Sequence, residues 1–537
     1  MKITQIPFQK TGFFSKTMHH YLEKDERILP FYENFPDVKG FEKQIETKRL
    51  SVRAQSRTIL VDVLKKQYQL LDCARSDKKT VTKTQKNIEL LSKENTFTIT
   101  TGHQLNLFTG PLYFLYKILS TINLCEELSE KFPKQHFVPI YWMATEDHDF
   151  EEINYFNFKD KKVQWNSNQT GAVGRFSTDG LEAVLKQFSD TLGTSKNTTE
   201  LKKLFSDAYV KHKNLADATR FIADKLFGNY GLVVLDADDK ALKKEFVPFV
   251  KEELLQQVSH QHVSKTITEF GKNYKVQVNP REINLFYLID GLRERILFEN
   301  EMYKVHNTAI KWSLSEIQKE VCDFPERFSP NVIMRPLYQE VILPNLCYIG
   351  GGGEIAYWLE LKTYFEAVHI PFPILLLRNS VQIVSEKQQR KLDRLSISTE
   401  ELFLNQHSLV AKKVKEKSIV KVDFTEQKKI LKTQFNRLKE IAKQTDISFI
   451  GAVNAQEKKQ LNGLVNLEKR LLRAEKRKQS DLVHSIIKLQ NELLPNQSLE
   501  ERYRNFSDYY VEYGEEFIVA LKENLQPLQL EFTVVSM

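Results

Sequence analysis

Four short, continuous apolar runs constrain the fold of this chain more than any other feature of its sequence. They are FTIT at residue 97, FVPIYWMA at 137, GLVVLDA at 231 and FPILLLR at 372, and helical patterns separate them. A continuous apolar run of this length is typical of a strand that is buried on both faces. Such strands form a mostly parallel sheet with helices on both sides. The sequence therefore predicts an α/β protein with a doubly wound sheet.

The stretches between and beyond these runs divide the chain into regions. Residues 155–215 and 250–330 are mixed, charged and aromatic without a clean sheet pattern, and we interpret them as insertions into the core. The segment before the first run has helical patterns. We expect residues 1–385 to form the core with its insertions, residues 386–490 to form a helical arm, and residues 491–537 to return to the core.

The predicted arm has the spacing of a coiled coil. Its predicted seam has two series, Leu431, Phe435, Leu438 and Ala442, and then Leu464, Leu467, Leu471, Ala474 and Lys478. Intervals of three and four residues are those of the a and d positions of a heptad. The segment SFIGAVNAQ at 448–456 could turn one helix back against the other. An antiparallel helical hairpin is one outcome, and pairing with a second chain is another.

The net charge of +8 is unevenly distributed. Residues 411–490 contain 20 lysines and arginines against 9 aspartates and glutamates, so this segment carries +11 and the rest of the chain carries −3. Because the excess lies in a region with helical periodicity, we interpret it as a solvated helix surface. A nucleic-acid partner is therefore disfavoured. A coiled-coil scaffold or nucleic-acid binder that uses this segment stays as an alternative function.

Several classes of protein do not fit the sequence. The beginning of the chain lacks the apolar segment of a signal peptide, and no run reaches the roughly 18 apolar residues that cross a bilayer. A cytoplasmic protein with no membrane partner is therefore expected. The four cysteines are far apart and form no CxxC pair, which argues against a disulfide framework and a cysteine zinc site. We predict no metal-ligating residues and no organic redox cofactor.

Polar residues that directly follow the apolar runs are the candidates for function, since ligands of such sheets bind at the carboxyl ends of the strands. The first group lies in TGHQLNLFTGP, between a predicted strand and a long apolar helix. Its glycines would let the backbone approach a phosphate or carboxylate, and the helix start favours an anion. An ordinary turn is the alternative, because no standard phosphate motif occurs here. The candidate binding residues are Gly102, His103, Gln104, Asn106, Thr109 and Gly110.

The second group follows the run FVPIYWMA directly and is strongly acidic. Four of the five residues from Glu146 to Phe150 are ionisable. Carboxylates at the end of a strand can accept the proton of an attacking amine, fix an ammonium group or hold Mg²⁺ through their oxygens. A solvated acidic turn is the alternative. We predict catalytic roles for Glu146, Asp147, His148 and Asp149.

The third group surrounds four consecutive glycines before an aromatic helix. These glycines form a second turn that could accept an anion, and Arg335 could clamp a carboxylate or phosphate with two hydrogen bonds. The alternatives are a mobile hinge and a surface ion pair. Arg335 is a catalytic candidate. The binding candidates are Gln339, Gly351, Gly352, Gly353 and Glu354, together with Asn379 at the end of the run FPILLL.

Three blocks of this sequence resemble one known family. TGHQLNLFTGPLYFLYK, PIYWMATEDHDFEEIN and RPLYQEVILPNLCYIGGGGEIAYWLELK are similar to the bacillithiol biosynthesis cysteine-adding enzymes, also called cysteine ligases. The resemblance extends along essentially the whole chain and is looser in the coiled-coil part. It implies a Rossmann-like core with two connecting-peptide insertions and a coiled coil that pairs two subunits into a homodimer.

The resemblance also implies an activity. It is the last step of bacillithiol biosynthesis, a ligase reaction that joins L-cysteine through its carboxyl group to the amine of glucosaminyl-malate. Where many relatives have a second glutamine, this chain has His103, and Asn106 and Gly352 also occupy variable places. The positions that match the family are Gly102, Gln104, Thr109, Gly110, Pro111, Glu146, Asp147, His148, Asp149, Glu152, Asn154, Arg335, Pro336, Gln339, Gly351, Gly353, Glu354 and Tyr357.

The implied chemistry predicts further components of the site. A carboxylate must be activated before an amine can attack it, so we expect ATP or another nucleotide, which Mg²⁺ could accompany. The glycine turns would then hold phosphates and the acidic block would deprotonate the amine. Another amino-acid-activating enzyme of the nucleotidyltransferase type is an alternative. It is disfavoured because the HIGH and KMSKS motifs are absent.

Overall fold

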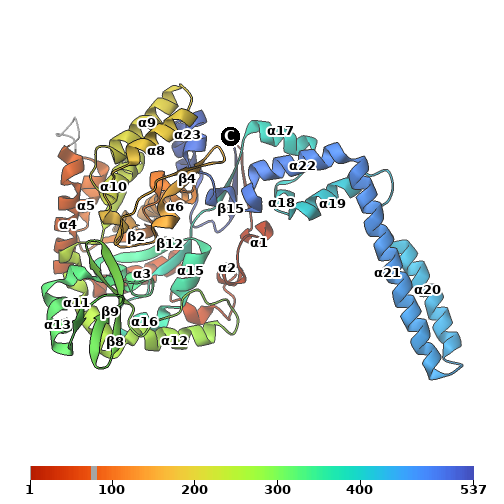
Figure 1. The fold of residues 1–537 in the computed structure, drawn as a ribbon, viewed down its shortest axis with the longest axis horizontal. Helices are drawn as coiled ribbons and strands as arrows, with labels where there is room; N and C mark the ends of the chain where they lie inside the picture. Colours follow the sequence, from red (N-terminus) through yellow and green to blue (C-terminus); the bar gives the residue numbers. More distant parts are fainter. Residues whose placement is uncertain (1, 74–80) are drawn as a thin grey trace.

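The computed structural model describes residues 2–73 and 81–537 and has a parallel five-stranded sheet at its centre (Figure 1). In spatial order the strands are β13 (Ile374–Leu377), β12 (Asn345–Gly350), β2 (Thr96–His103), β3 (His136–Met143) and β6 (Val233–Asp236). All eight residues of β2 are buried, as expected for a strand covered on both faces. The predicted α/β class is confirmed. Strand β12 was not predicted, because its short apolar run follows another apolar stretch.

The strand order locates the place where ligands bind in such sheets. From β2 the chain continues outward through β3 to β6, and it later returns to the other side of β2 with β12 and β13. The order of the strands therefore reverses between β2 and β12. At such a switch point the loops at the carboxyl ends of the two strands diverge and leave a crevice. Gly102 lies at the end of β2, and Gly351 directly follows β12.

Helices from several parts of the chain cover the sheet. Helix α6 (Tyr113–Lys131) connects β2 with β3 and packs against both strands. Helix α3 (Val38–Ser51) packs against β12 and β13, and α10 (Leu215–Phe227) packs against β6. The other helices of the body include α1 (Phe8–Thr11), α2 (Lys16–Leu22), α4 (Ala54–Cys73), α5 (Lys83–Leu90), α14 (Met334–Ile342), α15 (Gly352–Leu359) and α16 (Lys362–Ala367).

The segment 155–215 forms a small unit between β3 and β6. Its elements are the antiparallel pair β4 (Tyr155–Phe158) and β5 (Lys161–Gln164), followed by α8 (Leu181–Thr191) and α9 (Lys196–Tyr209). Phenylalanine rings from this unit pack around Phe108 of the loop after β2. This insertion therefore supports the first glycine loop from one side.

The segment 250–330 contains a complete antiparallel sheet, although its sequence had no clean sheet pattern. Two helices precede it, α11 (Lys240–Gln256) and α12 (Val258–Phe270). The strands, in spatial order, are β10 (Lys311–Trp312), β9 (Met302–Val305), β8 (Leu292–Glu299), β7 (Leu285–Ile289) and β11 (Phe328–Pro330). Most residues of β8 are partly exposed, so its apolar and polar positions do not alternate clearly. Helix α13 (Leu314–Asp323) lies between β10 and β11 in the chain.

The two ends of the chain meet in a third sheet. Strand β15 (Phe532–Ser536) lies between β1 (Lys2–Ile6), which is antiparallel to it, and β14 (Val381–Val384), which is parallel. The N-terminal region is thus not entirely helical, in contrast to the prediction. The reason is that β1 completes a sheet with a strand more than 500 residues away, and no local pattern indicates such a pairing.

The arm is an antiparallel helical hairpin that projects away from the body (Figure 1). It consists of α20 (Thr425–Ala442) and α21 (Ile447–Lys478), whose facing side chains include the ion pairs Lys428–Glu468 and Lys439–Glu457. The predicted turn at 448–456 is wrong. The Asp446 carboxylate accepts the Ser448 N–H at 2.7 Å and caps α21 one residue before it begins. The reversal therefore occurs at 443–446.

The predicted seam of the hairpin is partly correct. Phe435 and Ala442 are buried against Val453, whereas Leu438 and Leu467 are exposed. The remaining helices of this half are α17 (Glu386–Arg394), α18 (Thr399–Leu402), α19 (Gln406–Lys417), α22 (Ser480–Leu493), α23 (Ser507–Tyr513) and α24 (Glu516–Asn524). Among the described helices, none has an apolar stretch long enough to cross a membrane.

Candidate functional site

A cavity of about 710 Å³ lies at the carboxyl ends of β2, β3 and β12, where the strand order reverses. Segments far apart in the sequence meet there. They are the first glycine loop (residues 101–111), the acidic block (residues 146–149), the start of α14 and the second glycine turn (residues 350–353). The predicted site residues that line it are Gly102, His103, Gln104, Glu146, Asp147, His148, Asp149, Arg335, Gly351, Gly352, Gly353 and Glu354. One common cavity is therefore available for a reaction with several reactants.

Five of the predicted binding residues do not line this cavity. Asn106, Thr109 and Gly110 lie in the buried loop behind it. Gln339 is buried one turn further along α14, where its side-chain oxygen accepts a hydrogen bond from Arg335. Asn379 is buried, accepts the Ser120 hydroxyl and donates to the Gln526 carbonyl, so it connects α6 with the C-terminal segment.

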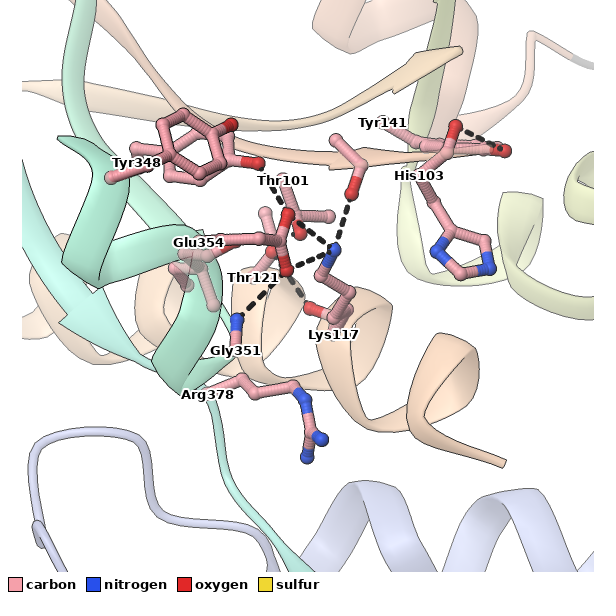
Figure 2. Close-up of polar contacts among 12 residues, drawn as sticks. Thr101, His103, Lys117, Thr121, Tyr141, Tyr348, Gly351, Glu354 and Arg378 are labelled. Atoms are coloured by element: carbon pink, nitrogen blue, oxygen red, sulfur yellow. Dashed lines mark hydrogen bonds and ion pairs between the residues drawn. The ribbon is translucent and has the colours of Figure 1, made fainter. Parts of the chain in front are cut away.

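A buried ion pair joins the two glycine turns, and Figure 2 shows its contacts. The ammonium group of Lys117, in the second turn of α6, donates to the Gly102 carbonyl at 2.5 Å and to the Glu354 carboxylate at 2.7 Å. The other acceptor sites of Glu354 are used by the Tyr348 hydroxyl at 2.7 Å and the Gly351 N–H at 2.9 Å. Lys117 and Glu354 thus set the separation of Gly102 from Gly351 across the crevice.

The electrostatics of this pair depend on both partners. Burial raises the pKa of Glu354, but the charge of Lys117 and three hydrogen bonds together hold it below its usual value. Burial also lowers the pKa of Lys117, against the opposing effect of Glu354. Lys117 is not among the residues predicted from the sequence. The available signal was a single cation in the apolar run LYFLYKIL, because a buried lysine needs an anionic partner.

The acidic block contains groups with different surroundings. Glu146 is mostly buried and forms an ion pair with Lys243 of α11. The two oxygens of Asp147 accept the Gln104 amide at 3.0 Å and the His148 N–H at 2.8 Å. Asp149 is more open, with its side chain 57% exposed. Among these carboxylates, Asp147 combines a fixed position with lone pairs that remain free, since a carboxylate has about four acceptor sites.

The hydrogen bonding of His148 fixes its tautomer. Its Nδ1 lies 2.6 Å from a guanidinium nitrogen of Arg293, in β8 of the second insertion. A guanidinium only donates, so Nδ1 is the acceptor and the ring proton is on Nε2. Arg293 also donates to the Ser329 hydroxyl and lies over the Phe286 ring, with 4.1 Å from its central carbon to the ring centre. The inserted sheet therefore orients the acidic block.

The guanidinium of Arg335 lies among aromatic rings rather than carboxylates. It donates to Gln339 and to the Tyr357 hydroxyl at 3.0 Å, and it is about 6 Å from the rings of Trp142, Tyr348 and Trp358. Within the described parts of the chain, five cavity arginines form no ion pair, namely Arg281, Arg293, Arg295, Arg335 and Arg502. Cations without protein counter-ions favour anionic ligands.

One of these arginines is presented by a segment with no regular structure, residues 271–284. Buried Glu360, at the end of α15, accepts the N–H groups of Gln277 at 2.7 Å and Val278 at 3.1 Å. The next residues of the segment, Asn279 and Arg281, reach the cavity. Glu360 therefore connects the helix of the second glycine turn with the segment that carries Arg281.

We expect the order of this segment to depend on pH through Glu360. Burial raises the pKa of Glu360 to about 7 from an ordinary value of 4.5, although its two N–H bonds act in the opposite direction. A raised carboxyl pKa stabilises the closed segment fully below pH 4.5, and this stabilisation is lost as the pH rises towards 7. Hydrogen exchange at 271–284, corrected for its intrinsic pH dependence, should report more opening at pH 8 than at pH 5. Glu360→Gln should remove that difference, and an unchanged difference in the variant would contradict this role.

Comparison with known proteins assigns both halves of the chain to the same family. Residues 1–379 match the family described as "Bacillithiol biosynthesis BshC, N-terminal Rossmann-like domain". Residues 381–537 match "Bacillithiol biosynthesis BshC, C-terminal coiled-coil domain". The cavity lies in the first of these two regions, apart from Arg502.

Several similar proteins are each named "Putative cysteine ligase BshC". The protein of Flavobacterium johnsoniae is 57% identical over 99% of this chain and 99% of its own length. The protein of Flavobacterium psychrophilum is 57% identical over 99% of this chain and 98% of its own length. The protein of Christiangramia forsetii is 52% identical over 99% of this chain and 98% of its own length. The similarity thus covers the body and the arm together.

Proposed function

Since this chain belongs to the bacillithiol biosynthesis BshC family, we propose that it is a cysteine ligase. In this reaction the carboxyl group of L-cysteine forms an amide with the amine of glucosaminyl-malate, as the last step of bacillithiol biosynthesis. The main support from the structure is the convergence of the acidic block, Arg335 and both glycine turns on one cavity. Its unpaired arginines suit an acceptor that carries the carboxylates of malate.

The cysteine carboxylate must be activated, and ATP is the simplest agent. The residues around the second glycine turn fit a phosphoryl group. Helix α15 begins there, and among residues 2–73 and 81–537 no atom lies within 4 Å of a side chain placed at Gly353. In the same part of the chain, the buried Nε of Arg378 beside this turn has no hydrogen-bond partner. Among the described residues, no group of three or more His, Cys, Asp or Glu side chains is arranged to hold a metal, so we assign no residue to Mg²⁺.

In the proposed amide-forming step the amine nitrogen attacks the activated carbonyl carbon of cysteine. A carbon–nitrogen bond forms, and the bond from that carbon to the phosphoryl oxygen breaks. Phosphate or AMP then leaves with the bonding electrons. The surplus proton of the nitrogen passes to Asp147, because Glu146 is paired with Lys243 and His148 Nδ1 is occupied by Arg293. Arg335 is placed to stabilise negative charge on the leaving group.

Mass spectrometry of reaction mixtures tests this function directly. Purified protein is incubated with L-cysteine, glucosaminyl-malate and one nucleoside triphosphate at a time. We expect a product whose mass equals the two substrates minus water, formed only with a hydrolysable nucleotide. Release of AMP and pyrophosphate would indicate an adenylate, and release of ADP and phosphate would indicate an acyl phosphate. Failure to form product with every nucleotide would contradict the proposal.

We also propose that the arm pairs two copies of the chain. Ile430, Leu438 and Ile441 lie on one side of α20 and are each more than 40% exposed. An apolar stripe of this kind on a coiled-coil hairpin is suited to a second copy. The double variant Ile430→Glu/Ile441→Glu should be monomeric in sedimentation experiments. Lys432→Glu, on the opposite face, should leave the assembly unchanged, and dimers of equal stability in both variants would exclude this surface.

A further inference from the structure

A second and much smaller cavity lies behind the first glycine loop, between that loop and α10. Its volume is about 10 Å³. Its lining residues are His103, Gln104, Asn106, Thr109, Phe114, Tyr141, Tyr209, Thr219 and Ile222. His103 and Gln104 line both this cavity and the large one. Four of the predicted binding residues, His103, Gln104, Asn106 and Thr109, therefore meet here.

Four buried polar atoms around this cavity have no hydrogen-bond partner among the described residues. They are His103 Nε2, Asn106 Oδ1, Thr109 Oγ1 and Thr219 Oγ1. Each of the four residues is more than nine-tenths buried. Leaving one buried polar group unsatisfied costs about 1–3 kcal/mol, and four around one cavity are unusual in a native protein. We therefore expect a bound molecule in this cavity that completes the hydrogen bonds of these four atoms.

We propose that the small cavity is a binding site for one water molecule, which joins the first glycine loop to α10. A space of roughly 10–15 Å³ holds one water, provided that two to four polar partners surround it. Both conditions are met here. The two threonine hydroxyls donate to the water oxygen, and the water donates its two hydrogens to Asn106 Oδ1 and His103 Nε2. All four polar atoms and all four sites of the water are then used.

The protonation state of the His103 ring agrees with these hydrogen bonds to the water. Burial, together with the nearby charge of Lys117, lowers the pKa of His103 to about 3. The ring is therefore neutral at physiological pH, and Nε2 accepts the water hydrogen when the ring proton is on Nδ1. A bound cation is disfavoured, because it would experience the same repulsion from Lys117.

A water at this site would also help to hold the loop that lines the large cavity. Phe108 and Thr109 adopt positive φ angles of 48° and 70°, which are uncommon for residues other than glycine. Such a backbone persists only when surrounding contacts hold it in place. The same loop begins with Gln104, whose amide donates to Asp147 and to Glu152. A water that fixes Asn106 and Thr109 therefore helps to hold Gln104 beside the acidic block.

A crystal structure of the wild-type protein at high resolution tests the site without any substitution. We expect one ordered water within about 2.7–3.2 Å of at least three of the four atoms. Empty density, or rotamers in which the four side chains satisfy one another directly, would overturn the proposal. This result is independent of whether the protein is a cysteine ligase.

Hydrogen exchange with a matched pair of variants tests the stabilising role. Thr219→Val keeps the shape of the side chain but removes one donor to the water. We expect exchange of the 103–110 amides to become roughly tenfold faster, the ratio that corresponds to one lost hydrogen bond. Thr121→Val is the control, because the buried Thr121 hydroxyl donates to a carbonyl of its own helix, that of Lys117, and does not line the small cavity. Equal exchange in Thr219→Val and in the wild type would overturn the role.

Discussion

Lys117→Met is expected to abolish product formation and to destabilise the body of the protein by about 3–5 kcal/mol. Methionine has a similar length but cannot compensate the charge of Glu354, whose carboxylate would remain buried beside it. The Gly102 carbonyl would lose its donor as well. Because Lys117 bonds both glycine turns, its loss should also change their separation. The effect on activity should therefore be larger than the loss of stability alone would produce.

Chemical unfolding followed by tryptophan fluorescence provides the measurement, since all four tryptophans lie between residues 142 and 358 and none is in the arm. Lys131→Met is the matched control. Its ammonium group forms a partly exposed pair with Glu127 near the end of the same helix, and pairs at the surface contribute about 0–1 kcal/mol. The double variant Lys117→Met/Glu354→Gln should regain part of the stability without regaining activity. A Lys117→Met protein with normal turnover would refute the positioning role.

Asp147→Asn is expected to reduce the rate of amide formation by roughly 10²–10⁴ fold while leaving the fold intact. Asparagine has the same shape and keeps one oxygen that can accept a hydrogen bond, but it cannot take a proton from the attacking amine. The hydrogen-bond donors to Asp147 are the Gln104 amide and the backbone N–H of His148, which are both neutral, so its replacement breaks no hydrogen bond to a charged group. Product formation under saturating substrates is the measurement. The fold is checked by the unfolding midpoint.

Two neighbouring residues serve as comparisons for Asp147. Asp149→Asn should have a much smaller effect, because this carboxylate is largely solvated. His148→Ala should reduce the rate by disturbing Arg293, since the Nδ1 of His148 accepts from Arg293. The hydrogen bond to Asp147 is retained in this variant, because its donor is the backbone N–H of residue 148. If Asp149→Asn were more damaging than Asp147→Asn, the assignment of the proton acceptor would have to move to Asp149.

Much of the fold follows from local sequence patterns. Four of the five strands of the parallel sheet coincide with the continuous apolar runs, because a strand buried on both faces needs apolar residues throughout. The inserted sheet of residues 285–330 has no continuous apolar runs from which it could be predicted, since its strands are short or half exposed. The pairing of β1 with β15 was also missed, because it joins opposite ends of the chain. Patterns report burial of a segment and do not report its partner.

For the candidate site too, some residues could be predicted from the sequence and others could not. Gly102 and His148 could be predicted to meet, because they lie at the ends of two predicted strands of one parallel sheet. Arg335 and Gly352 line the same cavity, but they flank β12, which the sequence did not reveal. The lone lysine at position 117 in an apolar helix was a signal for a buried ion pair, but its partner Glu354 lies 237 residues away and could not be identified from the sequence. Arg281, Arg293 and Arg295 come from an insertion whose placement over the sheet has no local signal. Asn106 and Thr109 had suitable chemistry for a ligand but face a different, enclosed space.

The sequence by itself determined the class of fold, the family and the edge of the sheet at which the polar residues gather. Only the tertiary structure decided which ionisable groups neutralise one another and which remain free for a ligand. The physical reason is the distance along the chain over which each property is determined. Hydrophobic periodicity reflects whether each residue is buried, which is encoded within a few neighbours. The charge state and direction of a side chain depend on groups within about 4–6 Å in space, and here these are often more than a hundred residues away along the chain.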